Sequence, residues 1–438
     1  MIELRTAEIA ELVHGDSQAE AIVTGVSTDS RSVRPGDLFV ALAGEHADGT
    51  VFADQALASG AAAALVRRGA EGPGRIAVDD PLEALGVIAR EVRLRSSARV
   101  VGITGSTGKT STKDILAALV APHAAAVSSR QNENNELGVP LTLSRLEVST
   151  EVAIVEMAMR GLGQIAYLAE IARPDIGIVT GVGPVHLELL GTVENVAAAK
   201  AELLEALPAD GVAVVPHDEP LLAPHVASLA ARVVTFDAEQ GAGVRLLGFR
   251  PDGSGGEAEI RIGSRTLHVP VSFTAPHNAL NLTAALAAYD ALGLPLDAVG
   301  AQRLEVQFSR WRGEELPLAG GGLLIADCYN ANPTSMRAAL EHLTAVARGR
   351  RRVALLGDMA ELGDEADRYH REVGETAAAL GVEQLVAVGE RARLYGGIWF
   401  GTVAEAREAL PGLVSPGDVV LVKASRSMGL EELVEAFE

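Results

Sequence analysis

The segment 100–110, Val-Val-Gly-Ile-Thr-Gly-Ser-Thr-Gly-Lys-Thr, is the most informative part of this sequence. Its apolar first half predicts a strand, and the apolar periodic segment 114–119 predicts a helix after the loop. A loop between a strand and a helix aims backbone N–H groups and the helix N-terminus at phosphate groups. We therefore expect nucleotide binding by Gly105, Ser106, Thr107, Gly108, Lys109, Thr110 and Ser111.

Two side chains of this loop have separate expected roles. Lys109 contacts the β- and γ-phosphates of ATP as a point charge, and the Thr110 hydroxyl ligates Mg²⁺. The spacing differs from that of the general nucleotide loop, because two residues rather than four separate Gly105 from Gly108, and Ile103 occupies the place of the first glycine. An ordinary glycine-rich turn is the alternative. Gly-Lys-Thr between a strand and a helix favours nucleotide binding.

The order of elements predicts an α/β protein built on parallel sheets. Apolar runs alternate with glycine-containing turns and Ala/Leu-rich helical stretches, a pattern typical of strands buried on both faces. Residues 251–256 predict a hairpin or excursion loop. Breaks near residues 95–98 and 304–322 divide the chain into three predicted domains, 1–96, 97–305 and 306–438. The predicted strands are 99–103, 152–155, 176–180, 212–215, 323–326, 353–356, 385–388 and 419–422.

Composition excludes several classes of protein. The 438 residues include 37 Lys and Arg against 58 Asp and Glu, a formal net charge of −21, whereas nucleic-acid binding needs a basic surface. No run approaches the roughly 18 apolar residues of a membrane span, and the first residues lack the apolar stretch of a signal peptide. The single cysteine, Cys328, allows no intrachain disulfide. We expect a cytoplasmic protein with no nucleic-acid partner and no membrane span.

Three further side chains are candidates for the site. Glu156 ends an apolar strand, where doubly wound sheets bind ligands, and either holds Mg²⁺ directly or through water, or makes a local cap or ion pair. His186 follows another strand end and is either structural or a contact to metal or phosphate. Lys200 lies in the apolar stripe of a predicted helix, 193–207. Either its ammonium reaches solvent, or a specific partner or a chemical reaction compensates for its burial.

With these residues the chain resembles the Mur ligase family along its whole length. Residues 27–31 and 33–42 resemble the UDP-binding region of that family, and the short loop 105–110 resembles its nucleotide loop. The resemblance implies an N-terminal UDP-substrate-binding α/β domain, a central P-loop ATPase-like domain and a C-terminal Rossmann-like domain. The implied substrate-binding residues are Ser30, Arg31, Asn132, Asn134, Asn135, Tyr329, Asn330 and Asn332.

The resemblance also implies roles in catalysis. Glu156 and His186 fall on positions associated with Mg²⁺, and Lys200 falls on a lysine that CO₂ carbamylates, which makes it an anionic oxygen ligand. The implied catalytic residues are Lys109, Lys200, His186 and Glu156, the implied metal ligands are Thr110, Glu156, His186 and Lys200, and the further ATP contacts are Asn278, Asn281, Arg310 and Asp327. Ser309 and Ala326 depart from the family pattern, and Arg312 is an alternative to Arg310.

The implied activity is an ATP-dependent ligation. The segment 329–333, Tyr-Asn-Ala-Asn-Pro, resembles the family members that join D-alanyl-D-alanine to UDP-N-acetylmuramoyl-tripeptide through an acyl phosphate. These two compounds, ATP and Mg²⁺ are the implied substrates and cofactors, and a monomer is expected. The alternatives are another amino-acid-adding ligase, a folylpolyglutamate-synthase-like enzyme, and, outside the enzymes, a nucleotide-gated regulatory or scaffold protein.

Overall fold

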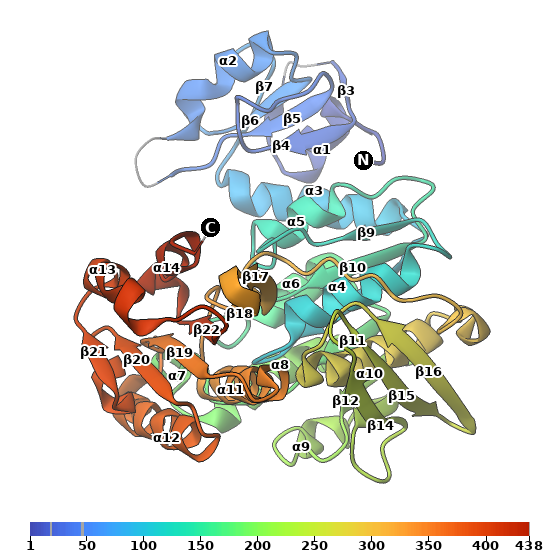
Figure 1. Cartoon of the computed structure of the whole chain (residues 1–438). Helices are drawn as coiled ribbons and strands as arrows, with labels where there is room; N and C mark the ends of the chain where they lie inside the picture. Colours follow the sequence, from blue (N-terminus) through green and yellow to red (C-terminus); the bar gives the residue numbers. More distant parts are fainter. Residues whose placement is uncertain (18–19, 45–47, 438) are drawn as a thin grey trace.

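The computed structural model describes residues 1–17, 20–44 and 48–437, in which three α/β units follow one another along the chain (Figure 1). The N-terminal sheet has the strand order β2-β7-β6-β5-β4, with β2 antiparallel to β7 and the other neighbours parallel. A separate pair, β1 with β3, is antiparallel. The elements are β1 (Leu4–Arg5), α1 (Thr6–Leu12), β2 (Asp16–Ser17), β3 (Ile22–Val23), β4 (Gly25–Ser27), β5 (Asp37–Val40), η1 (Gly49–Phe52), α2 (Ala53–Ala58), β6 (Ala63–Arg67) and β7 (Arg75–Val78).

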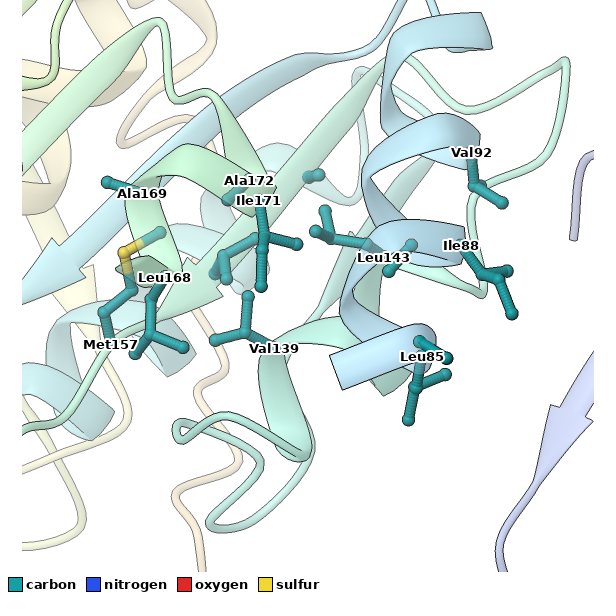
Figure 2. Packing of buried hydrophobic residues seen from close by; sticks show 14 of the residues in the cluster. Leu85, Ile88, Val92, Val139, Leu143, Met157, Leu168, Ala169, Ile171 and Ala172 are labelled. Carbon is teal, nitrogen blue, oxygen red and sulfur yellow. The ribbon is translucent and has the colours of Figure 1, made fainter. Parts of the chain in front are cut away.

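The long helix α3 (Pro81–Arg95) lies between the N-terminal sheet and the central unit (Figure 1). Asp80 caps its N-terminus by accepting the Leu82 N–H, and Pro81 suits the first helical position because its missing N–H is not needed there. Its apolar residues belong to one buried cluster that also includes residues of α5, α6 and the N-terminal sheet (Figure 2). The residues labelled there include Leu85, Ile88, Val92, Val139, Leu143, Leu168 and Ile171.

The central sheet has the order β16-β15-β14-β13-β12-β11-β8-β10-β9, parallel from β9 to β14 and antiparallel at β15 and β16. Helices cover both faces: Val101 and Ile103 pack toward α4 and α10, while Val100 packs toward α3, α5 and α6. The elements are β8 (Arg99–Thr104), α4 (Lys109–Val120), β9 (Ala126–Ser128), α5 (Gly138–Leu143), β10 (Val152–Glu156), α6 (Gln164–Ala172), β11 (Ile176–Val179), α7 (Leu187–Leu190), α8 (Val193–Glu205), β12 (Val212–Pro216), α9 (Ala223–Val226), β13 (Arg232–Asp237), β14 (Val244–Pro251), β15 (Gly256–Ile262), β16 (Arg265–Val271), α10 (Pro276–Ala291) and η2 (Leu296–Ala298).

The C-terminal sheet has the order β17-β18-β22-β19-β20-β21, with an antiparallel edge at β17. Ile325 packs toward α11 and α12 on one face, and Leu324 packs toward α13 and α14 on the other. The elements are β17 (Glu314–Leu318), η3 (Ala319–Gly321), β18 (Gly322–Ala326), α11 (Pro333–Ala347), β19 (Arg352–Gly357), η4 (Gly363–Glu365), α12 (Ala366–Ala379), β20 (Gln384–Val388), η5 (Ala392–Tyr395), β21 (Ile398–Phe400), α13 (Val403–Leu413), β22 (Val419–Lys423), η6 (Arg426–Met428) and α14 (Glu431–Glu435).

These sheets confirm the predicted α/β class, and each predicted strand coincides with an observed one to within a residue or so at its ends. Residues 251–256 connect β14 to β15, as a hairpin prediction requires. The helix predicted at 193–207 ends two residues earlier, at Glu205. None of the helices in the described ranges combines the length and apolar character needed to cross a membrane.

Candidate active site

A cavity of about 620 Å³ opens where the central unit meets the C-terminal unit. The central unit contributes the N-terminus of α4 and the loops that follow β10 and β11, and the C-terminal unit contributes the loop between β18 and α11. Its lining is mostly polar and includes Ser106, Thr107, Gly108, Lys109, Thr110, Ser111, Asn132, Asn134, Asn135, Glu156, Arg160, Gln164, His186, His277, Asn281, Arg312, Asp327, Tyr329, Asn330, Asn332 and Lys423.

The glycine loop is held open at the N-terminus of α4. Gly108 precedes the helix with φ 79°, a left-handed conformation that glycine adopts without a steric cost. The Lys109 Nζ donates to the carbonyl of Gly105 at 2.7 Å. The Ser106 hydroxyl donates to the Gly183 carbonyl at 3.1 Å and accepts from the Gly183 N–H at 2.9 Å, so the loop is tied to the segment after β11. The free N–H groups of α4 thus point toward the cavity.

Glu156 is fully buried at the end of β10 and faces this loop. Its Oε1 accepts from Asn134 Nδ2 at 2.8 Å, and its backbone N–H donates to the Ser129 hydroxyl at 3.0 Å. Its Oε2 has no hydrogen-bond partner among the described residues. A buried carboxylate oxygen without a donor is costly, so this atom is suited to a cation or a donor from a ligand.

Two lysines, Lys109 and Lys200, interact with each other, and of these two Lys109 lines the cavity whereas Lys200 does not. Lys200 is 2% exposed on α8, and among the described residues its ammonium has neither a hydrogen-bond acceptor nor a carboxylate partner. Burial, reinforced by the Lys109 cation, lowers the pKa of Lys200 well below its ordinary value. Burial also lowers the pKa of Lys109, and the Glu156 charge opposes that change. The 2% exposure of Lys200 agrees with its predicted place in the apolar stripe of the helix.

His186 is the residue before α7, at the rim of the cavity, and has φ 53°. Its Nδ1 forms a hydrogen bond with the carboxylate of Glu361, which comes from the C-terminal unit. This bond lowers the pKa of Glu361, with burial acting in the opposite direction. Among the described residues, no group of three or more His, Cys, Asp or Glu side chains is arranged to hold a metal.

The C-terminal wall is built around a buried ion pair. Lys423, 2% exposed at the end of β22, lies 2.7 Å from Asp327 Oδ2 and donates to the Asn330 carbonyl at 2.9 Å. Asn332 caps α11 and its Nδ2 donates to the carbonyl of Ser106 at 3.3 Å, which joins the wall to the glycine loop.

Comparison with known proteins follows the same division of the chain. Residues 22–93 match the model described as Mur ligase family, catalytic domain, residues 103–289 the Mur ligase middle domain, and residues 311–426 the Mur ligase glutamate ligase domain. A relative from Synechocystis sp., named UDP-N-acetylmuramoyl-tripeptide–D-alanyl-D-alanine ligase, is 37% identical over 94% of this chain and 91% of its own length. This chain belongs to the Mur ligase family.

Solved Mur ligase structures share the whole fold. A crystal structure of MurF from Acinetobacter baumannii has a TM-score of 0.91 at 29% identity, covering 99% of this chain and 98% of that one. The structure of MurF ligase from Thermotoga maritima in complex with ADP has a TM-score of 0.84 at 29% identity, covering 95% and 97%.

Some predicted residues of this Mur ligase lie outside the cavity lining. Arg310 is exposed with its guanidinium over the Trp311 ring at 4.8 Å, whereas Arg312 lines the cavity and stacks on Tyr329 at 3.9 Å. Asn278 is buried and accepts from Asn281 Nδ2 at 3.1 Å, so it orients a lining residue. The structure thus places Arg312, and not Arg310, in the cavity wall.

The two residues predicted to bind UDP lie in the N-terminal unit, away from this lining. Ser30 is 9% exposed and lies 3.5 Å from Gln55 Oε1, and Arg31 pairs with Asp29 at 2.8 Å. Lys423 was not predicted as a site residue. It is a charged residue directly after the apolar run 419–422, and the same pattern had selected Glu156. Residues 361–363 resemble the family's C-terminal domain, but the sequence predicted no role for Glu361, whose contact with His186 joins residues 175 positions apart.

Proposed function

We propose that this Mur ligase joins D-alanyl-D-alanine to UDP-N-acetylmuramoyl-tripeptide with ATP, giving the pentapeptide precursor of peptidoglycan. The observation that carries the proposal is full-length similarity to ligases of that name, together with a cavity that combines the glycine loop and the Tyr329–Asn332 segment. The ADP bound in the Thermotoga maritima relative supports ATP as the nucleotide.

The reaction has two steps. The terminal carboxylate of the tripeptide attacks the γ-phosphorus of ATP, an oxygen–phosphorus bond forms, and ADP leaves, which produces an acyl phosphate. The amine of D-alanyl-D-alanine then attacks the acyl carbon, loses a proton, and phosphate leaves with its electron pair. No side-chain nucleophile is needed, so the chain's residues act by positioning and by stabilising charge.

Charge on the transferred phosphoryl group is dispersed by Lys109 and by the N–H groups at the start of α4. Arg312 supplies a second cation from the opposite wall, and among the described residues its Nε has no partner. Asn281, beside Gly108, contacts the nucleotide, and Asp327 does so from the C-terminal wall.

The donor set around Glu156 fits Mg²⁺. The unpartnered Oε2 of Glu156 and the Thr110 hydroxyl would hold the ion with phosphate oxygens and water, since Mg²⁺ takes one or two carboxylates beside substrate phosphates. The ion, when bound, neutralises charge on the β- and γ-phosphates. His186 adds a nitrogen at the rim.

Lys200 is proposed to carry a carbamate. Its neutral amine attacks CO₂, a nitrogen–carbon bond forms, and one proton is released. The burial of Lys200 and the absence of an acceptor for its ammonium among the described residues support this chemistry, because the anion it produces would face the Lys109 cation.

Substrate contacts are divided between the units. Ser30 and Arg31 bind the UDP portion, Asn132, Asn134 and Asn135 bind the tripeptide side of the reacting carbonyl, and Tyr329, Asn330 and Asn332 bind the acceptor dipeptide. We further propose domain boundaries near residues 96 and 305, a monomer, and a cytoplasmic location where both substrates are present. The net charge of −21 agrees with the absence of a nucleic-acid partner.

Phosphate release from ATP tests the function. We expect release with Mg²⁺ only when UDP-N-acetylmuramoyl-tripeptide and D-alanyl-D-alanine are both present, and none from Lys109→Ala. Release with a dipeptide precursor and a free amino acid would reassign the chain to a sibling ligase. Nucleotide binding without substrate-dependent release would favour the regulatory or scaffold alternative.

A further inference from the structure

Glu361 connects the C-terminal unit to the central unit at the rim of the cavity. It lies in the loop between β19 and η4. Its carboxylate accepts a hydrogen bond from His186 Nδ1 and lies 3.7 Å from Arg160 Nε, and its carbonyl accepts from the Glu188 N–H at 3.3 Å. All three partners belong to the central unit, so one residue contacts the facing wall at three points.

Both members of the central hydrogen bond have an unusual backbone. Glu361 has φ 62° and His186 has φ 53°, which lie in the left-handed region that is unfavourable for a residue with a side chain. Such conformations persist where the surroundings impose them, and they concentrate at functional sites. Here the strained residues face each other across the boundary between two units.

Packing on either side of the Glu361–His186 hydrogen bond fixes the two loops that carry these residues. Leu362 is 1% exposed in the C-terminal core, and Leu187 is 7% exposed in the cluster shared by the central unit and α3. Gly363 lies against Glu188, where an added Cβ would be 3.5 Å from its Cα. The carboxylate of Glu361 is therefore presented to His186 by a packed loop rather than by a free side chain.

The hydrogen bond also decides which ring nitrogen of His186 is available. The Glu361 carboxylate accepts at Nδ1, so Nδ1 carries a proton and Nε2 is the ring nitrogen left to face other groups. A histidine whose Nδ1–H is held by a carboxylate has a fixed ring orientation. His186 and Arg160 both line the cavity.

We propose that Glu361 is a positioning residue, through which the C-terminal unit orients His186 and Arg160 in the cavity wall and so completes the site only when the two units are together. The inference rests on the proposed function. It goes further by assigning a role to a residue of the C-terminal unit that lies outside the cavity lining.

The competing explanation is that Glu361 only stabilises the contact between the two units. The left-handed backbone of Glu361 allows a substitution that distinguishes this explanation from a positioning role. Glu361→Gly removes the carboxylate and also removes the left-handed strain, so it should unfold no more easily than the wild-type protein. Glu361→Gln keeps an acceptor for Nδ1. Asp364→Ala, which removes an exposed carboxylate from the adjacent η4, is the matched control.

The experiment measures kcat and KM for ATP, by phosphate release, and urea unfolding for each variant. We expect Glu361→Gly to lower kcat at least tenfold with unfolding unchanged, Glu361→Gln to retain most of kcat, and Asp364→Ala to match the wild type. In a double-mutant cycle with His186→Ala, the losses should not add. Wild-type kcat in Glu361→Gly, or a loss that adds fully to that of His186→Ala, overturns the inference, whereas a wild-type protein without substrate-dependent release overturns the proposed function itself.

Discussion

Substituting Lys423 with Met tests the ion pair between Lys423 and Asp327 in the cavity wall. The methionine keeps the apolar stem of Lys423 but removes its charge, its pairing with Asp327 at 2.7 Å and its hydrogen bond to the Asn330 carbonyl at 2.9 Å. Asp327, whose side chain is 18% exposed, then lacks a cation in a poorly solvated position.

The expected size of the effect follows from that burial. Removing one partner of a buried pair costs about 3–5 kcal/mol, because the other charge is left uncompensated. Asp327 borders the cavity and keeps some solvent, so we expect the lower end, about 3 kcal/mol, which is roughly a 150-fold change in the unfolding equilibrium. Asp327→Asn combined with Lys423→Met should restore at least about 1 kcal/mol, because it removes the stranded charge.

Tryptophan fluorescence in urea measures this effect locally. The chain has two tryptophans, Trp311 just before β17 and Trp399 in β21, so the signal reports unfolding of the C-terminal sheet. A loss below about 1 kcal/mol for Lys423→Met, or a double variant that is less stable than the single one, would refute the reasoning.

Three further outcomes are expected. Gly108→Ala places a Cβ 2.5 Å from Asn281 Oδ1 at φ 79°, so KM for ATP should rise at least about tenfold. The control Gly293→Ala, at φ 77° with open space around the added Cβ, should leave KM for ATP unchanged. Equal effects of the two substitutions on KM would contradict the loop geometry. Burial raises the pKa of the Cys328 thiol to about 12, so a thiol reagent should react with the unfolded chain but not with the native protein at about pH 8. Burial lowers the pKa of His277 from 6.5 to about 3, so below about pH 6.5 the unfolded chain binds a proton that the native protein does not bind. The free energy of unfolding should therefore fall as the pH drops below about 6.5, and it should fall less steeply in His277→Gln. Urea unfolding at about pH 7 and pH 5 measures both changes.

The sheets were predictable because their signal is local. Runs such as 152–155 and 419–422 are buried on both faces, so each is apolar without interruption and its position can be read from composition alone. The glycine loop was predictable for the same reason, since its strand, turn and helix are contiguous. The antiparallel strands β15 and β16 alternate polar with apolar residues at a sheet edge, and only the turn at 251–256 was predicted there.

Contacts across the cavity were not predictable from one sequence. The bond between His186 and Glu361 and the choice of Arg312 over Arg310 depend on how two separately folded units meet, and neither leaves a periodic signal. Lys200 is an intermediate case. Helical spacing predicted that Lys200 lies among apolar residues. Its near-complete burial, and the absence of a hydrogen-bond partner among the described residues, could be seen only in the folded structure.

Isotope transfer provides the test of the ligation chemistry. The substrate is UDP-N-acetylmuramoyl-tripeptide labelled with ¹⁸O in both oxygens of its terminal carboxylate, incubated with ATP, Mg²⁺ and D-alanyl-D-alanine. Mass spectrometry measures the ¹⁸O content of the released phosphate and of the peptide product. An acyl phosphate intermediate predicts one labelled oxygen in the released phosphate for each pentapeptide formed. Unlabelled phosphate, or phosphate released without pentapeptide, would contradict the proposed ligase mechanism.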